Sequence, residues 1–314
     1  MSAHALRETA AGQAGVVEVS PMAIHIGAEI HGVDLSRPLP PAQLSAVRAA
    51  LLRWKVVFFR DQHLDHARHI AAARQFGDTT AGHVVYGSDG KYPQIYSVAK
   101  DRKANRFQGQ VLFRPWSGWH TDITAAINPP AASMLRGDVV PPYGGDTLFT
   151  NLVAAYNALS PVMQKFVDGL RGMHRFAPPP GVDQTPEYLE LMKKRTLVSE
   201  HPIVRVHPET GERALFVSPS FLKSIVGVSP RESQVLLEFL WEHIVRPEFT
   251  ARFRWAPGSV AFWDNRATAH LAPRDIFDSD FDRQFYRVTL VGDVPVGVDG
   301  QPSKAIEGVP INAL

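Results

Sequence analysis

The stretches that decide the fold lie near the carboxyl end of the chain: FRWAPGSVAFWDN at residues 253–265 and RQFYRVTLVGD at residues 283–293. Both are rich in aromatic and β-branched residues and contain turn residues at their boundaries, which is typical of strands. Shorter runs of the same kind occur along the rest of the chain, where strands outnumber helices and do not alternate with them. This order argues against a doubly wound α/β sheet and predicts an antiparallel β-sandwich or barrel decorated by helices.

Helices are expected at the flanks of this β structure. Apolar positions recur every three or four residues in PAQLSAVRAALLRW, residues 41–54, and helices are also predicted over residues 64–77 and 230–244. The fold class is therefore mainly β with flanking helices. Residues 1–15 are small and polar without periodicity, which predicts a disordered lead, and residues 16–314 are expected to form a single domain.

The composition limits the possible functions. With 314 residues, 45% hydrophobic and 20% charged, the chain can build a sizeable core. The 33 Lys and Arg nearly balance the 31 Asp and Glu, so the sequence lacks the basic stripe that nucleic acids require. It also lacks a long apolar run and an apolar leader segment, so we expect a cytoplasmic protein without a membrane partner. The chain contains no cysteine, so any metal site must use nitrogen and oxygen ligands.

One long loop is predicted before the candidate site. DRKANRFQGQVLFRPWSG, residues 101–118, has no clean period and mixes cations with aromatic residues. Long loops inside compact domains are often functional lids. The apolar side chains of Leu112, Phe113 and Trp116 could cover a substrate, and packing beneath the loop is an equal alternative.

Histidines with an acidic residue two positions away are candidate metal ligands. There are three such pairs: His63 with Asp65, His120 with Asp122, and His207 with Glu209. On a strand, residues i and i+2 point to the same face, so such a pair can bind one ion from two positions. Asp65 lies where a helix starts and suits an N-cap. His207 and Glu209 flank a proline in a turn and should both face solvent. We therefore expect neither of these two pairs to bind a metal.

The remaining pair lies in SGWHTDITAAI, residues 117–127. It follows the long loop and enters an apolar, β-prone run, so His120 and Asp122 should share an inward face while Thr121 points away. The spacing alone is weak evidence, because about one such pair is expected by chance among thirteen histidines and 31 acids. His270, just beyond an apolar strand, could complete a set of two imidazoles and one carboxylate, the arrangement that binds non-haem Fe(II) and leaves positions open. A structural role for His270 is the alternative.

Two arginines share one face of the last predicted strand. They are Arg283 and Arg287. Bulky apolar residues lie on both faces of this strand, so the strand should be buried. A buried charge that has lost its partner costs roughly 3 to 5 kcal/mol, so each guanidinium needs an anion. The anions could be protein carboxylates such as Asp280, Asp282 or Asp293. They could instead be the carboxylate, sulfonate or sulfate groups of small molecules.

Four motifs carry a family resemblance when they are taken together. They are WHTDITAAINPPAASMLRG (119–137), YGGDTLF (143–149), WDNRATAH (263–270) and RQFYRVTLVGD (283–293). In this order they resemble the taurine dioxygenase (TauD/TfdA) family of Fe(II)- and 2-oxoglutarate-dependent oxygenases, and especially its alkylsulfatase and taurine dioxygenase branches. The resemblance extends over nearly the whole chain. It implies a double-stranded β-helix, or jelly roll, with Fe(II), 2-oxoglutarate and dioxygen as cofactor and co-substrates.

The resemblance also assigns roles to individual residues. It implies that His120, Asp122 and His270 bind the iron, that Arg283 and Thr147 hold the distal carboxylate of 2-oxoglutarate, and that Arg287 pairs with the sulfonate or sulfate of the substrate. It further implies a homo-oligomer, either a dimer or a tetramer.

Substrate contacts are matched only in part. His83, Tyr86 and Phe221 correspond to residues of the family's sulfonate pocket. Trp116 stands where taurine dioxygenases have an asparagine, and prolines at 178–180 replace an aromatic residue. Both changes remove features suited to a small polar amine, so we expect a larger, more hydrophobic substrate.

The expected function is hydroxylation of an organic anion, with an alkyl sulfate or sulfonate as the favoured class and with release of sulfate or sulfite. A second possibility is an oxygenase that tailors a carboxylate-bearing natural product such as a terpenoid acid. A third, non-enzymatic possibility is a small-molecule sensor built on a jelly roll.

Overall fold

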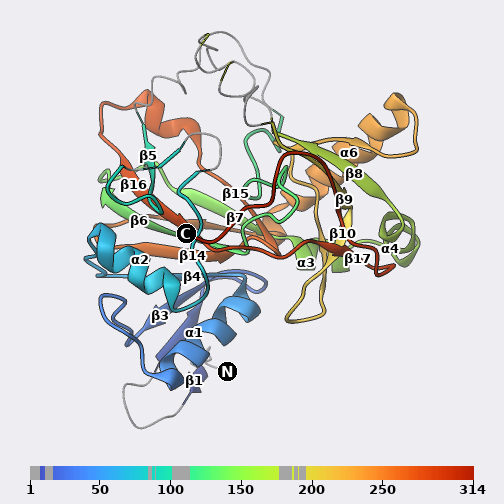
Figure 1. Ribbon diagram of the computed structural model, residues 1–314. Helices are drawn as coiled ribbons and strands as arrows, with labels where there is room; N and C mark the ends of the chain where they lie inside the picture. The colour runs from blue at the N-terminus through green and yellow to red at the C-terminus, as the bar shows by residue number, and fades with distance from the viewer. Residues whose placement is uncertain are drawn as a thin grey trace.

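The computed structural model describes residues 8–10 (backbone only), 17–83, 87–88, 90–100, 114–176, 186, 190 and 196–314. Within these ranges the regular structure is mostly β-sheet, with a few helices at its flanks (Figure 1). This confirms the predicted fold class. Within the same ranges, no helix combines the length and the apolar character that a membrane span requires.

The largest sheet has eight strands. In spatial order they are β1 (Glu8–Ala10), β2 (Val17–Pro21), β3 (Ala28–His31), β4 (Val56–Phe59), β14 (Val260–Asp264), β6 (Ala132–Val139), β16 (Gln284–Thr289) and β5 (Tyr96–Ala99). The neighbours pair antiparallel except β3 with β4. The two predicted carboxyl-terminal strands are thus confirmed as β14 and β16, which lie on either side of β6.

Three smaller sheets complete the β structure. They are β13 (Thr250–Phe253), β7 (Thr147–Asn151) and β15 (Thr268–Leu271); β12 (Leu222–Ile225), β8 (Arg171–Arg175), β9 (Val198–Pro202) and β18 (Lys304–Glu307); and β11 (Arg213–Leu215), β10 (Val204–Val206) and β17 (Val296–Gly297). All of their pairings are antiparallel. Together with the large sheet they form a jelly roll.

An aromatic core joins the large sheet to the β13–β7–β15 sheet. Phe58 and Trp263 of the large sheet cluster with Phe149 of β7 and Phe253 of β13, and all four are buried. The rings of Phe58 and Phe253 stack with their centroids 3.9 Å apart. Burying side chains of this size stabilises the fold by roughly 1.5 to 3 kcal/mol each, so the packing of these two sheets is firmly defined.

Helices cover the outer parts of the sheets. They are α1 (Pro41–Trp54), α2 (His66–Arg74), α3 (Leu152–Asn157), α4 (Pro161–Asp168) and α6 (Pro230–Ile244), with short 3-10 helices at Pro247–Phe249 and Arg274–Asp278. Val47 and Leu51 of α1 join the same buried cluster as Phe262 of β14. Asp65 caps α2 by accepting the Arg68 backbone N–H, which confirms its structural role.

Two predicted segments differ from the structure or lie partly outside the described residues. Glu8–Ala10, inside the predicted disordered lead, form β1, whose backbone pairs antiparallel with β2; the rest of the lead is not described. Of the predicted lid at 101–118, residues 101–113 lie outside the described residues and residues 114–118 form turns.

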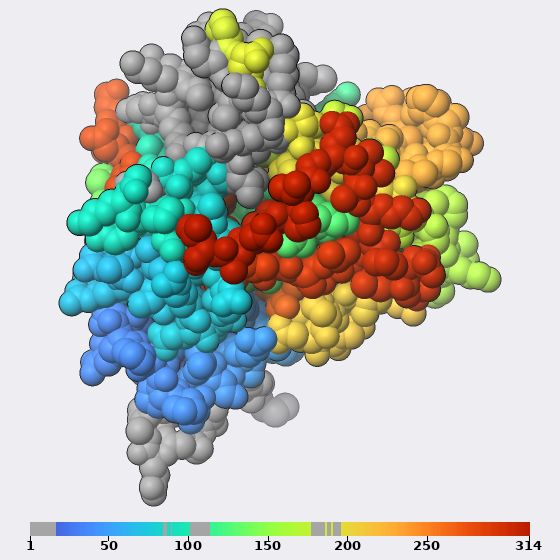
Figure 2. Space-filling model, in the orientation of Figure 1, coloured from blue at the N-terminus to red at the C-terminus, as the bar shows by residue number. Residues whose placement is uncertain are grey.

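The carboxyl-terminal segment crosses one face of the molecule (Figure 2). Ile311 is buried in a cluster with Ile123 and Ala126. Its backbone N–H donates to Asn128 Oδ1, and its carbonyl accepts from Asn128 Nδ2. The end of the chain is therefore fastened to the turn that follows Asp122.

Candidate active site

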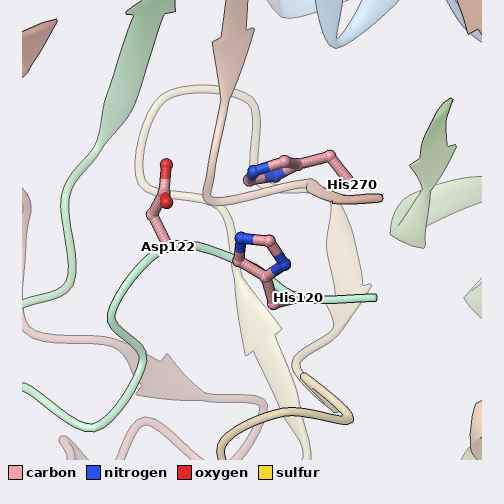
Figure 3. Close-up of side chains that lie close together, drawn as sticks. All are labelled: His120, Asp122 and His270. Carbon is pink, nitrogen blue, oxygen red and sulfur yellow. The ribbon is translucent and has the colours of Figure 1, made fainter. Parts of the chain in front are cut away.

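Three predicted ligands meet in the interior. His120, Asp122 and His270 each place one ligand atom so that these atoms lie within 4.8 Å of one another (Figure 3). Among the described residues, no other set of three or more such side chains is close enough to hold a metal ion. Two nitrogen donors and one carboxylate form the ligand set of non-haem Fe(II) sites. The residues therefore fit ferrous iron.

The two histidines are joined through their backbones. The His120 N–H donates to the His270 carbonyl at 2.9 Å, and the His270 N–H donates to the His120 carbonyl at 2.7 Å. Beyond His120 the chain turns, with Ile123 at φ +47°, and does not continue as the predicted extended run. Thr121 points away, as predicted, and its hydroxyl donates to the Thr268 carbonyl. The turn places Asp122 beside the two imidazoles.

Hydrogen bonding and burial prepare both imidazoles to bind a metal. His120 Nδ1 lies 3.0 Å from the Gly118 carbonyl oxygen, which can only accept, so Nδ1 carries the proton and Nε2 keeps its lone pair. His270 Nδ1 is buried and has no hydrogen-bond partner among the described residues. Burial lowers the pKa of both rings below the ordinary value. The neutral form that binds metals is therefore favoured.

Asp122 is ionised and is held at both oxygens. Its Oδ2 accepts from Ser133 Oγ at 2.6 Å, and its Oδ1 accepts from Arg287 Nη1. Burial alone would raise the pKa of Asp122, but the positive charge of Arg287 opposes this effect, as do the neighbouring imidazoles, and the pKa lies well below its usual range.

The turn between β14 and β15 is anchored by buried charges. Arg266 Nε and Nη2 donate to the two oxygens of Asp264, each at 2.8 Å, and His207 Nε2 lies 2.9 Å from Asp264 Oδ2. His207 was expected to face solvent, and this prediction is wrong, because its side chain is only 1% exposed. Its Nδ1 accepts the backbone N–H groups of Glu209 and Thr210, so both ring nitrogens have partners and burial is tolerated.

Arg287 of β16 and Arg283, the residue directly before this strand, are both buried, as the sequence predicted. Arg287 pairs with Asp122 and not with Asp280, Asp282 or Asp293. Arg283 forms no ion pair within the described part of the chain. Its Nε donates to the Gly145 carbonyl at 3.3 Å.

Among the described residues, Arg283 is therefore a buried cation without an anionic partner. Burial lowers its pKa to about 10, although Asp275 and Asp146 oppose the effect. Nearby, Thr147 Oγ1 accepts the Trp255 Nε1–H, which leaves the hydroxyl proton of Thr147 free to donate to another acceptor. Both groups suit a carboxylate ligand.

A row of four side chains, which we call the aromatic wall, runs from the metal ligand His120 to Arg287. It consists of His83, Tyr96, Phe176 and Phe221, all buried. The centroid distances are 4.8 Å from His83 to Tyr96, 6.0 Å from His83 to Phe176, 5.6 Å from Phe176 to Phe221 and 6.5 Å from Phe221 to His120. The guanidinium carbon of Arg287 lies 5.1 Å from the Tyr96 ring centroid.

The sequence predicted only part of this wall. His83 and Phe221 were expected in the pocket, whereas Tyr96 and Phe176 were missed. Tyr96 is brought there because it pairs with Arg287 across β5 and β16, and this register is not visible in the sequence. Trp116 lies beside Trp241 of α6, with ring centroids 6.2 Å apart. Tyr86 and prolines 178–180 lie outside the described residues.

Comparisons with known proteins agree with this geometry. The family model described as taurine catabolism dioxygenase TauD, TfdA family matches residues 18–289. An alpha-ketoglutarate-dependent sulfate ester dioxygenase of Pseudomonas putida is 42% identical over 299 residues, covering 92% of this chain and 94% of that protein. An alkylsulfatase of Acinetobacter baylyi is 36% identical over 289 residues, covering 89% and 86%.

Solved structures are also similar. A taurine dioxygenase from Burkholderia xenovorans is 62% identical with a TM-score of 0.83, covering 94% of this chain and 96% of that chain. A structure of AAD-2 in complex with Mn(II) and N-oxalylglycine is 26% identical with a TM-score of 0.72, covering 89% and 98%. The chain therefore belongs to the TauD, TfdA family and is an Fe(II)- and 2-oxoglutarate-dependent dioxygenase.

Proposed function

We propose that this enzyme hydroxylates an alkyl sulfate or sulfonate at the carbon that bears the anionic group, and so releases sulfate or sulfite. The observation that carries the proposal is the position of Arg287, a buried cation between the metal ligands and the aromatic wall. The similarity to a sulfate ester dioxygenase and to an alkylsulfatase supports this substrate class over a terpenoid acid.

The metal site would be formed by His120, Asp122 and His270. The unpartnered Nδ1 of His270 and the fixed tautomer of His120 support this assignment. Iron and 2-oxoglutarate, when bound, supply the oxidation of a C–H bond by dioxygen, with release of succinate and carbon dioxide. The protein then has to bind two anions, orient one carbon and exclude water.

Arg283 and Thr147 would hold the distal carboxylate of 2-oxoglutarate. A carboxylate beside Arg283 would supply the missing anion for a buried guanidinium, and the Thr147 hydroxyl can donate to the same group. Gly145 leaves room for this arrangement, since a Cβ there would lie 3.2 Å from Arg283 Cδ and Nε.

Arg287 would hold the sulfate or sulfonate of the substrate. One of its terminal nitrogens binds Asp122, and its buried Nε has no partner among the described residues, so a donor remains for a second anion. An anion fixed here presents the adjoining carbon to the metal side, and this positioning selects the site of attack. The aromatic wall would take the alkyl chain.

The bond cleavage follows from the position of the new hydroxyl. A carbon that bears both a hydroxyl and a sulfate loses the hydroxyl proton, forms the C=O bond of an aldehyde and breaks the C–O bond to sulfate. One alkyl sulfate, one 2-oxoglutarate and one dioxygen thus yield an aldehyde, sulfate, succinate and carbon dioxide. From a sulfonate the C–S bond breaks and sulfite is released.

The remaining predicted contacts belong to the same proposal. By resemblance Tyr86 would contact the sulfonate end of the substrate, and Trp116 would favour a hydrophobic substrate. We also expect a homo-oligomer, a dimer or a tetramer, which light scattering would detect.

The test is product analysis across substrate classes. Protein loaded with Fe(II) is supplied with 2-oxoglutarate and dioxygen. It is then tested with alkyl sulfates of increasing length, and separately with sulfonates and carboxylates of the same chain lengths. Succinate and sulfate, or succinate and sulfite, are expected in equal amounts. Succinate formed together with a stable hydroxylated acid would favour natural-product tailoring, and no succinate from any substrate would contradict an enzymatic role.

A further inference from the structure

A chain of buried hydrogen bonds ends on Asp122. Trp263 Nε1 donates to Asn265 Oδ1 at 2.9 Å, Asn265 Nδ2 donates to Ser133 Oγ at 2.9 Å, and Ser133 Oγ donates to Asp122 Oδ2 at 2.6 Å. All four side chains are buried, with at most 2% of each exposed. We call Trp263, Asn265 and Ser133 the relay.

The direction of every bond in the relay is fixed by chemistry. The indole N–H can only donate, so Asn265 must present its carbonyl oxygen to Trp263 and its amide nitrogen to Ser133. An amide nitrogen can only donate, so Ser133 receives from Asn265 and its own proton must go to Asp122. The ionised carboxylate is an acceptor, and a hydrogen bond to a charged acceptor is stronger than one between neutral groups.

Two residues of the relay lie on paired strands, and the third follows directly after one of these strands. Ser133 of β6 lies opposite Trp263 of β14 in the antiparallel pairing of these strands. Asn265 follows Asp264, whose carboxylate is held by Arg266 and His207. The donor to Asp122 Oδ2 is thus fixed independently of Arg287, which binds the other oxygen.

We propose that Ser133 is a positioning residue for the metal and that Asn265 acts through it, so that the relay sets the orientation of the Asp122 carboxylate and thereby the affinity for a divalent ion. The inference rests on the proposed role of Asp122 as a ligand. Groups that orient metal ligands commonly change metal affinity by roughly 10- to 100-fold when they are removed. This role also accounts for the buried polar side chains of Asn265 and Ser133 next to the metal ligand Asp122.

The test is the binding of Mn(II) alone to chelator-stripped protein, measured by calorimetry without 2-oxoglutarate. Ser133→Ala should weaken binding roughly 10- to 100-fold, and Asn265→Ala should weaken it less. Because Asn265 acts through Ser133, the double variant should match Ser133→Ala alone to within about twofold. Ser233→Ala is the matched control, a buried serine of α6 that accepts the Ile225 N–H, and it should bind Mn(II) like the parent protein.

Other outcomes separate the possibilities. If Ser133→Ala binds Mn(II) as tightly as Ser233→Ala, Ser133 has no positioning role. If the two single effects multiply in the double variant, Asn265 does not act through Ser133. Thermal unfolding in EDTA and the visible spectrum of the Co(II) form distinguish a loss of fold from a changed ligand set. If Ser133→Ala does not fold, Asn265→Ala carries the test. Asp122→Asn serves as the reference, because unchanged Mn(II) binding in that variant would overturn the metal assignment and the proposed function together.

Discussion

Arg287 binds Asp122, one of the metal ligands, and is proposed to bind the anionic group of the substrate as well. Replacing it by alanine should leave 2-oxoglutarate binding in place, because Arg283 remains. Substrate binding should weaken by roughly 2 to 5 kcal/mol, the range for loss of a desolvated charge partner. Titration with an alkyl sulfate checks this. Arg287→Lys keeps the charge and should recover part of the affinity, and an unchanged substrate affinity in Arg287→Ala would remove Arg287 from the anion site.

Gly144 and Gly145 form a natural pair of test positions. Both have positive φ, +76° and +64°, so alanine at either should cost about 1 to 2 kcal/mol of stability. At Gly145 the new Cβ would lie 3.2 Å from Arg283, whereas among the described residues a Cβ at Gly144 would meet only Asp275, at 4.0 Å. Gly145→Ala should therefore raise the KM for 2-oxoglutarate several-fold, while Gly144→Ala should not. Equal KM values in the two variants would show that Arg283 does not depend on this glycine.

Individual residues were predictable where their chemistry is local. The spacing of His120 and Asp122, the burial of Arg283 and Arg287, and the cap at Asp65 all follow from short sequence patterns. His207 was misjudged because its partner, Asp264, lies on another element. Tyr96 was missed because strand register, not sequence distance, places it against Arg287.

The β14–β15 turn is the element on which the site depends most. Four consecutive side chains make polar contacts here: Trp263 and Asn265 belong to the relay, Asp264 binds His207, and Arg266 binds both Asp264 and Glu209. The strands on both sides were predictable from their composition. The turn itself was not, because its side-chain partners come from β6 and the β10–β11 hairpin.

Removing the His207 side chain should loosen this turn. His207→Ala leaves a buried oxygen of Asp264 without one of its donors, and we expect the free energy of unfolding to fall by roughly 1.5 to 3 kcal/mol. Urea unfolding of the metal-free protein measures this change. His31→Ala provides the control, because His31 contacts Ser20 at the surface. Equal stability of the two variants would mean that the His207–Asp264 contact contributes little.

At the scale of the whole molecule, the jelly roll brings together ligands that lie 150 positions apart in the sequence, at His120 and His270. The fold class was predictable because the strand pattern is strong throughout the chain. The sheet order was not, since β14 pairs with β4 and β6 across long sequence distances.

Buried histidines make the stability of the molecule depend on pH. Burial lowers the pKa of His69 and His201 to about 3 and that of His174 well below its ordinary value. Unfolding exposes these rings, whose pKa returns to about 6.5, so below that pH the unfolded state binds more protons and stability falls as the pH decreases. Each group contributes up to about 1.4 kcal/mol per pH unit.

Urea unfolding of metal-free protein between pH 7.5 and about 4.5 tests this dependence. The free energy of unfolding should be nearly constant above pH 7 and should decline below about pH 6.5. His69→Leu removes one titrating group and should reduce the slope in the acidic range. A slope identical to that of the parent protein would show that His69 does not contribute.

The paired backbones of His120 and His270 limit where the pocket can change its width. Two hydrogen bonds join the backbones of these residues, so the two segments cannot move apart without breaking them. We therefore expect a bulky substrate to be accommodated by movement of the aromatic wall, at His83, Tyr96 and Phe176. The backbones of the two histidines would stay in place while the side chains of the aromatic wall move.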